Sequence, residues 1–332
     1  MQDFERMGRV EAIRELFGGS GFEPFGTGAF EPAAGECVVN ASRLLLEGID
    51  FDLIYFPLKH LGYKAVALAT GELYGSLASA RTLGVKLGIS AKLGFSQVKE
   101  LWEGIVTAAK EFSYKSLSLD LQPSRNGLSI SVSATGVKAT AEAPVPASKD
   151  LLCISGALGA AFLGLQVLER GKGRFERGEE DREELEKYRM LAGSYLRPEL
   201  PAGLPEALSQ DGIVPSAACF VDRGLADALL SLVRSSGLGA KVYADRIPFE
   251  GGSFEFGKLI DTDPVSAAMN GGDDCRVLLA IPMAQYESFR HNFQTFDIIG
   301  HLAQSDVGAV LVSPDGLEHR VSAPGWPNKD NL

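Results

Sequence analysis

The sequence has few cysteines and histidines, and none of them form a recognisable metal-binding pattern. Its four cysteines and four histidines are widely separated along the 332 residues, with no pairs at the spacing that zinc sites use. A chain of this length also needs no disulfides to stabilise its core. We therefore interpret all eight as ordinary core or surface residues, and we expect a cytoplasmic protein.

An excess of basic charge and a clear membrane span are also missing. The chain has 32 Lys and Arg residues against 43 Asp and Glu, a net charge of −11. Acidic chains are repelled by nucleic-acid backbones and anionic lipid, so we expect no nucleic acid and no membrane as partners. One uncharged segment, 151–168, is nearly long enough to span a bilayer, but it divides into a strand pattern and a helix pattern.

Length and patterning indicate an α+β protein with two domains. At roughly 150 residues per domain the chain is long enough for two, and both halves mix strand and helix patterns. We expect an N-terminal domain at 1–138, a linker at 139–149 that contains two prolines, and a C-terminal domain at 150–332. Glycine is abundant, with 38 residues, which predicts many tight turns and close backbone approaches.

Hydrophobic periodicity predicts the main elements of both halves. In the first half we expect a helix at 3–17, strands at 37–46, 65–69, 83–89 and 128–132, and a helix capped by Ser96. In the second half we expect strands at 150–154, 277–281 and 309–312, a helix at 157–170 that ends at Gly171, and a helix at 225–236 that ends at Gly237. The charged stretch 171–189 is interpreted as a solvated helix or loop.

Two glycine-rich turns are candidate binding sites. Residues 155–161 (SGALGAA) follow a strand pattern and open a helix, where backbone N–H groups attract anions. Close packing of strand and helix would require the same small residues. Residues 270–274 (NGGDD) carry two adjacent carboxylates, which suit a cation, a ligand hydroxyl or a simple Asx turn.

Longer motifs resemble the thiamine-monophosphate kinase family, which belongs to the aminoimidazole ribonucleotide synthetase-like superfamily. They occur in the family's order across nearly the whole chain, at 46–52 (LEGIDFD), 57–65 (PLKHLGYKA), 154–161 (ISGALGAA), 268–274 (AMNGGDD) and 324–326 (PGW). The resemblance implies two α+β domains and a homodimer whose N-terminal sheets join in a barrel, with ATP bound near that junction. It also implies transfer of the ATP γ-phosphate to thiamine monophosphate, with Mg²⁺ neutralising the phosphate charge.

This chain departs from the family at most of the positions that carry metal-binding acids. The Gly-x-Gly-Asp-Asp turn is 26–30 (GTGAF), a Thr-Asp pair is Ser42-Arg43, and the Asp-x-Ser-Asp-Gly turn is 220–224 (FVDRG). By resemblance, the retained metal positions are Glu72 and Asp120. The nucleotide positions are Ser42, Arg43, Asp120, Asp222 and Arg223, and the substrate positions are Asp50, Asp273 and Trp326.

We favour the interpretation that the chain is a pseudoenzyme, which keeps the fold and the dimer without phosphoryl transfer. Mg²⁺ and ATP are implied by the resemblance, but the lost carboxylates argue against their binding. The alternatives are an active kinase with a reduced metal site at Glu72, Asp120 and Asp222, or an enzyme that acts on another phosphorylated or carboxylated ligand. A protein partner is a further possibility. We expect Arg43 to pair with Glu47 or Asp120 rather than with a phosphate.

Overall fold

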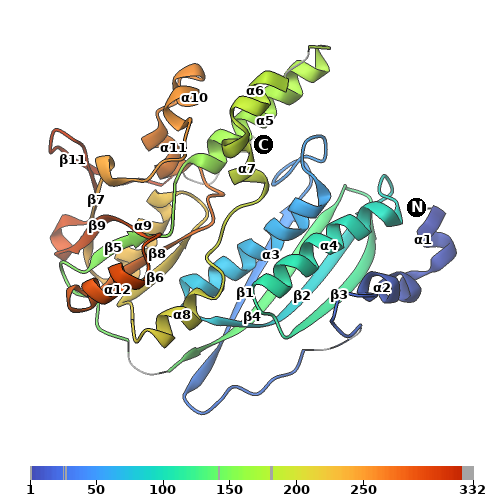
Figure 1. The fold of residues 1–332 in the computed structure, drawn as a ribbon, viewed down its shortest axis with the longest axis horizontal. Coiled ribbons are helices and arrows are strands. Elements are labelled where there is room, and N and C mark those ends of the chain that lie inside the picture. The colour runs from blue at the N-terminus through green and yellow to red at the C-terminus, as the bar shows by residue number, and fades with distance from the viewer. Residues whose placement is uncertain (1, 25, 27, 141–142, 180–181, 324–332) are drawn as a thin grey trace. The chain divides into compact units, whose positions relative to one another are not determined.

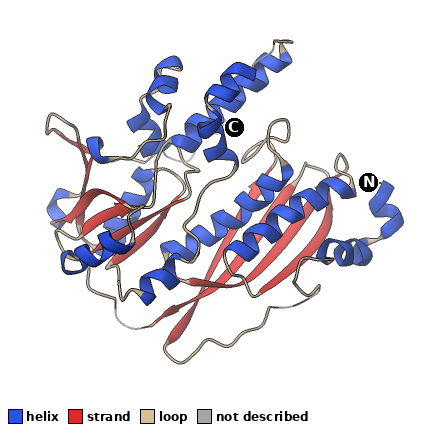
Figure 2. Ribbon diagram, viewed as in Figure 1, coloured by secondary structure: helices blue, strands red, loops and turns tan. Residues whose placement is uncertain are grey.

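The computed structural model describes residues 2–24, 26, 28–140, 143–179 and 182–323. The chain divides into two compact units (Figure 1). Unit 1 comprises Met1–Glu142 and Leu200–Ala207, and unit 2 comprises Ala143–Glu199 and Leu208–Leu332. Both units combine helices with a sheet, which confirms the predicted α+β class (Figure 2).

Unit 1 is built on a four-stranded sheet in the order β1-β4-β2-β3, in which only β2 and β3 are parallel. The strands are β1 (Glu36–Leu46), β2 (Ser79–Ser90), β3 (Ser116–Ser124) and β4 (Ser129–Ala139). Helices α3 (Leu58–Gly75) and α4 (Phe95–Glu111) cover one face (Figure 1). The alternating residues of β2 and β4 divide as predicted, because the apolar ones are buried and the serines and glycines between them lie on the other face.

The long helices α3 and α4 cross at two glycines. A Cβ atom on Gly62 would lie 2.1 Å from the Leu101 carbonyl oxygen, and one on Gly104 would lie 1.9 Å from that of Lys59. The backbones therefore touch, which no other residue type permits. The strand predicted at 65–69 is wrong, because this segment is the middle of α3. All residues from 61 to 71 are buried, and an apolar run of this kind has no periodicity that distinguishes helix from strand.

Two other helix boundaries in unit 1 differ from the prediction. The helix expected at 3–17 is divided into α1 (Gln2–Met7) and α2 (Arg9–Phe17), because Gly8 adopts a φ of 77°. Helix α4 begins after Gly94 instead of at Ser96, and the Gln97 Oε1 atom accepts a hydrogen bond of 2.9 Å from the Gly94 N–H. The helix start is therefore closed by Gln97 and Gly94, and the predicted cap Ser96 lies inside the first turn of the helix.

Unit 2 contains a seven-stranded sheet in the order β11-β10-β7-β9-β5-β8-β6. Its strands are β5 (Leu151–Ile154), β6 (Ala217–Val221), β7 (Gly239–Tyr243), β8 (Arg276–Ile281), β9 (Asp297–Ala303), β10 (Ala309–Val312) and β11 (Glu318–Arg320). Helix α9 (Leu225–Ser236) packs its apolar side on a core formed by these strands. The predicted strands at 150–154, 277–281 and 309–312 and the predicted helix at 225–236 are confirmed.

The remaining helices lie in the connections between these strands. They are α5 (Ala160–Glu176), α6 (Arg182–Lys187), α7 (Arg189–Leu196), α8 (Leu204–Gln210), α10 (Ser253–Leu259), α11 (Pro264–Asn270) and α12 (Tyr286–Asn292), with short 3₁₀ turns at Ala244–Arg246, Met283–Gln285 and Ser305–Val307. Helix α5 does not end at Gly171 as predicted, because that glycine is buried inside the helix. None of the helices in the described ranges is long and apolar enough to cross a membrane.

Candidate functional site

The two retained acidic positions lie in unit 1, and each is paired with an arginine. Asp120 on β3 forms an ion pair with Arg9 of α2, and the Arg9 Nε atom also donates to the Leu121 carbonyl oxygen at 3.3 Å. The hydrogen bond from Arg9 lowers the pKa of Asp120 below its usual value. Asp120 is therefore a charged carboxylate whose counterion is supplied by the chain.

Glu72 is paired in the same way. Its Oε1 atom lies 2.5 Å from the Arg43 Nη2 atom, and the arginine side chain is only 14% exposed. We expected Arg43 to pair with Glu47 or Asp120, and this expectation is corrected. Residues of β1 alternate between the two faces of the sheet, and this alternation places Arg43 on the face that α3 covers. The Glu47 carboxylate instead accepts a 2.6 Å hydrogen bond from the Leu128 N–H.

The two acidic positions lie on opposite faces of the sheet. Leu119 and Leu121 are buried under the helices, so Asp120 between them points to the uncovered face. Glu72 belongs to α3, which covers the other face. Ligands of one Mg²⁺ must converge to about 2.1 Å from the ion, and the described residues contain no group of three His, Cys, Asp or Glu that could hold a metal. These residues do not fit the shared magnesium site that the resemblance implies.

Two other predicted positions lie along β1 and the turn that follows it. Ser42 is exposed on the uncovered face, in register with Ser133 of β4. Asp50 closes the turn, because its Oδ2 atom accepts a 2.7 Å hydrogen bond from the Leu46 N–H. The sheet places Ser42 on the same face as Asp120, whereas Arg43 lies on the other.

In unit 2, the anion-attracting turn at 155–161 is occupied by a carboxylate of the chain itself. Asp274 accepts hydrogen bonds from the Gly159 N–H at 2.7 Å and the Ala161 N–H at 3.0 Å, where α5 begins. It is only 5% exposed, and burial raises its pKa to about 6 against the opposing effect of these bonds and of Arg276. The α5 N-terminus thus has its anion already, so the turn is not an open phosphate site.

The turns at 220–224 and 270–274 lie side by side. The Asp273 N–H donates to the Asp222 carbonyl oxygen at 2.5 Å, and a Cβ atom on Gly224 would lie 2.4 Å from the Met269 carbonyl oxygen. Asp222, Arg223 and Asp273 are therefore gathered at one end of the sheet. The structure thus brings together these three predicted residues of unit 2, whereas Trp326 lies outside the described residues.

Sequence reasoning missed the role of Asp274 and did not single out Arg276. The sequence suits Asp274 to a cation, a ligand hydroxyl or an Asx turn, whereas in the structure it binds the Gly159 N–H, 115 residues away. Arg276 donates to the carbonyl oxygens of Ala157 at 3.1 Å and Glu199 at 2.9 Å, which fixes the 155–161 turn from its other side. A basic residue at the start of a buried strand is the only local signal for this role.

Comparisons with known proteins agree on one group. No family model matches the chain. It is 24% identical over 238 residues to a thiamine-monophosphate kinase of Rhodopirellula baltica, a match that covers 71% of this chain but just under two thirds, 66%, of that protein. It is 26% identical over 260 residues to the thiamine-monophosphate kinase of Synechococcus elongatus, covering 75% of this chain and 74% of that protein.

Solved structures show the same fold. The thiamine monophosphate kinase of Aquifex aeolicus matches with a TM-score of 0.71 at 20% identity, covering 88% of this chain and 91% of that one. The hydrogenase maturation protein HypE of E. coli matches with a TM-score of 0.73 at 16% identity, covering 96% of this chain and 98% of that one. The predicted resemblance is thus confirmed: the chain is similar in sequence to thiamine-monophosphate kinases, and it shares the aminoimidazole ribonucleotide synthetase-like fold of these solved structures.

Proposed function

We propose that this chain is a thiamine-monophosphate-kinase-like protein that keeps the fold of its relatives without transferring phosphate. The observation that carries the proposal is the pairing of both retained metal positions, Glu72 with Arg43 and Asp120 with Arg9. In addition, the family's two turn aspartates are Ala29 and Phe30 here. Phosphoryl transfer depends on positioning and on charge neutralisation by the metal, and both require those acids.

Electrostatics supports this proposal. Two unit charges about 4 Å apart interact by roughly 4 kcal/mol at an effective dielectric near 20. A guanidinium beside each carboxylate therefore offsets most of the attraction that a divalent cation would gain there. Because Glu72 and Asp120 also lie on opposite faces of the sheet, a single ion cannot be bound by both carboxylates.

The proposal is tested by incubating the purified protein with MgATP and thiamine monophosphate and following thiamine diphosphate. We expect no product above a protein-free control. A turnover of about one per second, within the ordinary range of enzymes, would show that the chain is an active kinase. In that case Asp120→Asn should abolish the activity, and the matched control Glu103→Gln, an exposed acid on α4 paired with Lys59, should not.

The same protein serves to test for a small phosphate ligand. Each nucleotide or thiamine phosphate is added with and without Mg²⁺, and the midpoint of thermal unfolding is measured. A compound at a hundred times its dissociation constant adds about 2.7 kcal/mol of stability. A shift with ATP that requires Mg²⁺ would contradict the loss of the metal site. A shift with another phosphate compound alone would favour a binding protein.

The chain is proposed to act as a homodimer, joined through the uncovered face of the unit 1 sheet. This face carries small polar residues on β2 and β4, and on β1 it exposes Val38, Leu44 and Leu46 by 46%, 59% and 39%. We expect a dimer in sedimentation equilibrium, and Leu44→Lys should weaken it. Leu317→Lys, on an equally exposed leucine of unit 2 (58%), is the control and should leave the dimer intact. A monomeric wild type would refute this part.

A further inference from the structure

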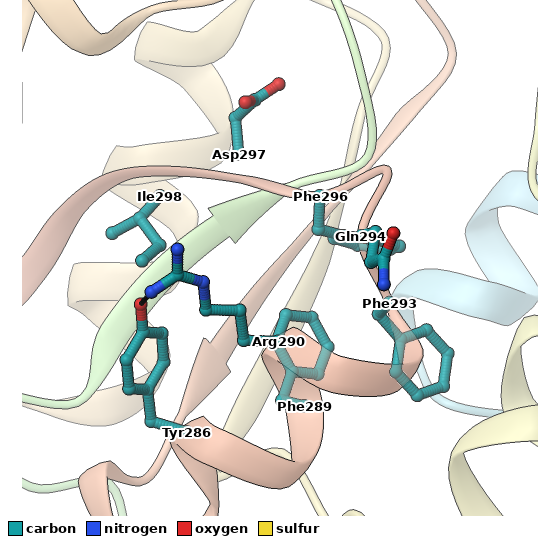
Figure 3. A pocket seen from close by; sticks show the side chains of 8 residues that line it. All are labelled: Tyr286, Phe289, Arg290, Phe293, Gln294, Phe296, Asp297 and Ile298. Atoms are coloured by element: carbon teal, nitrogen blue, oxygen red, sulfur yellow. Dashed lines mark hydrogen bonds between the residues drawn. The ribbon is translucent and has the colours of Figure 1, made fainter.

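A pocket of about 530 Å³ lies in unit 2 between α12 and the start of β9 (Figure 3). Eight residues between Tyr286 and Ile298 line it, and none of them is among the site residues that the sequence predicts. Small-molecule sites in proteins have volumes of about 300 to 1,000 Å³ and combine apolar walls with a few polar groups. The pocket therefore has the size of a ligand site that the proposed function does not use.

Three phenylalanine rings form one wall of this pocket. Phe289 is buried, at 2% exposure, and Phe293 stacks on it with a ring distance of 5.1 Å and an angle of 10°. Phe296 meets both rings edge-on, at 5.4 Å and 6.1 Å. Because each ring is fixed by the other two, the partly exposed faces of Phe293 and Phe296 form a preorganised surface for a further planar ring.

The one cation that lines the pocket is available for a ligand. The Arg290 Nη1 atom donates to the Tyr286 hydroxyl oxygen at 3.4 Å, and Figure 3 shows the guanidinium directed toward Tyr286 and Ile298. Throughout the described part of the chain, no carboxylate forms an ion pair with Arg290, whereas Arg9 and Arg43 each have one. A guanidinium that lines a pocket and has no carboxylate partner is suited to a carboxylate ligand, which it binds through two parallel hydrogen bonds.

The one acid of the pocket restricts the charge of the ligand. Asp297 is the first residue of β9, and its carboxylate points away from the rings (Figure 3). It is exposed and pairs with no cation of the described ranges, so it adds a negative charge at the edge of the pocket. This charge repels a ligand with two negative charges more strongly than a ligand with one.

From these contacts we propose that the pocket binds an aromatic carboxylate, with its ring against the phenylalanine wall and its carboxylate on Arg290. The ring contributes apolar contact and stacking, and the carboxylate contributes the charge-assisted hydrogen bonds. The inference is independent of kinase activity, because it depends only on residues 286–298.

The test compares each acid with its neutral amide. Binding of benzoate, benzamide, nicotinate, nicotinamide and phenyl phosphate to the full chain is measured by saturation-transfer NMR, with dissociation constants from titration. We expect the two carboxylates to bind at least about tenfold more tightly than their amides, which is the effect of one charge-assisted hydrogen bond. Phenyl phosphate tests the head group, because tighter binding of phenyl phosphate than of benzoate would show that the site takes a phosphate instead of a carboxylate.

Variants locate the site. Arg290→Gln should remove the preference for benzoate over benzamide, and Arg290→Lys should restore part of it. The control Arg234→Gln, an exposed arginine at the end of α9, should change nothing. Phe293→Leu should weaken acid and amide equally. The proposal is wrong if no probe binds the wild type, if acids and amides bind equally, or if Arg290→Gln binds benzoate as the wild type does.

Discussion

The buried carboxylate of Asp274 predicts an unusual dependence of stability on pH. In the folded chain burial raises its pKa to about 6, from an ordinary value of 3.8. The folded state therefore binds the proton more tightly than the unfolded state does. The stability that this group contributes is fully present below pH 3.8 and is lost as the pH rises to about 6.

The size of the effect follows from the difference between the two pKa values. At about 1.36 kcal/mol per pKa unit, a shift from 3.8 to about 6 corresponds to roughly 3 kcal/mol across the whole range. When the pH falls from about 7.5 to about 4.5, the tighter proton binding of the folded state raises the free energy of unfolding by roughly 2 kcal/mol of this total. The neighbouring Arg276 lowers the pKa of Asp274 and Asp273 raises it, and the value of about 6 includes both effects.

The perturbation is Asp274→Asn, which keeps an acceptor at the start of α5 and removes the titration. Urea unfolding is followed by circular dichroism for wild type and variant at both pH values, so that all other titrating groups cancel in the difference. We expect the wild type to gain about 2 kcal/mol relative to the variant at the lower pH. If both proteins respond equally to pH, Asp274 does not carry a buried charge and the reasoning fails.

Two further predictions concern unit 1. Gly62→Ala and Gly104→Ala should each destabilise the chain by about 1 to 3 kcal/mol or more in urea unfolding, because the new methyl group meets a carbonyl oxygen of the crossing helix. Gly193→Ala, where nothing lies within 4 Å, should be neutral or stabilising, and an equal loss in all three would contradict the packing argument. Arg9→Ala should raise the pKa of Asp120 toward its usual value in an NMR titration, while this exposed pair changes stability by no more than about 1 kcal/mol. An unchanged pKa would show that Arg9 is not the cause.

Local patterns in the sequence predicted the elements whose periodicity is strong. The alternation of Leu83, Val85 and Leu87 gave β2, and the helix at 225–236 has the predicted bounds, because Gly237 adopts a left-handed conformation there. The strand predicted at 65–69 is wrong because this segment is buried on all sides. The helix end predicted at Gly171 is wrong because packing inside unit 2 outweighs the weak preference of glycine against a helix.

The candidate site was less accessible to sequence reasoning. The resemblance located Glu72 and Asp120, but only the sheet shows that they lie on opposite faces. The arginine partners come from 29 and 111 residues away, and no spacing rule predicts contacts of that range. The pocket between α12 and β9 was missed because its phenylalanines resemble ordinary core residues in the sequence.

Strand β1 has a practical consequence for anyone who handles this protein. It is eleven residues long, lies at the edge of its sheet, and is paired on one side only within the described ranges. An open edge of this length is a template for strand addition by other chains, and it carries exposed leucines that favour aggregation. Preparations in which the proposed dimer has been weakened should therefore be kept dilute, because precipitation would otherwise compete with the release of monomers.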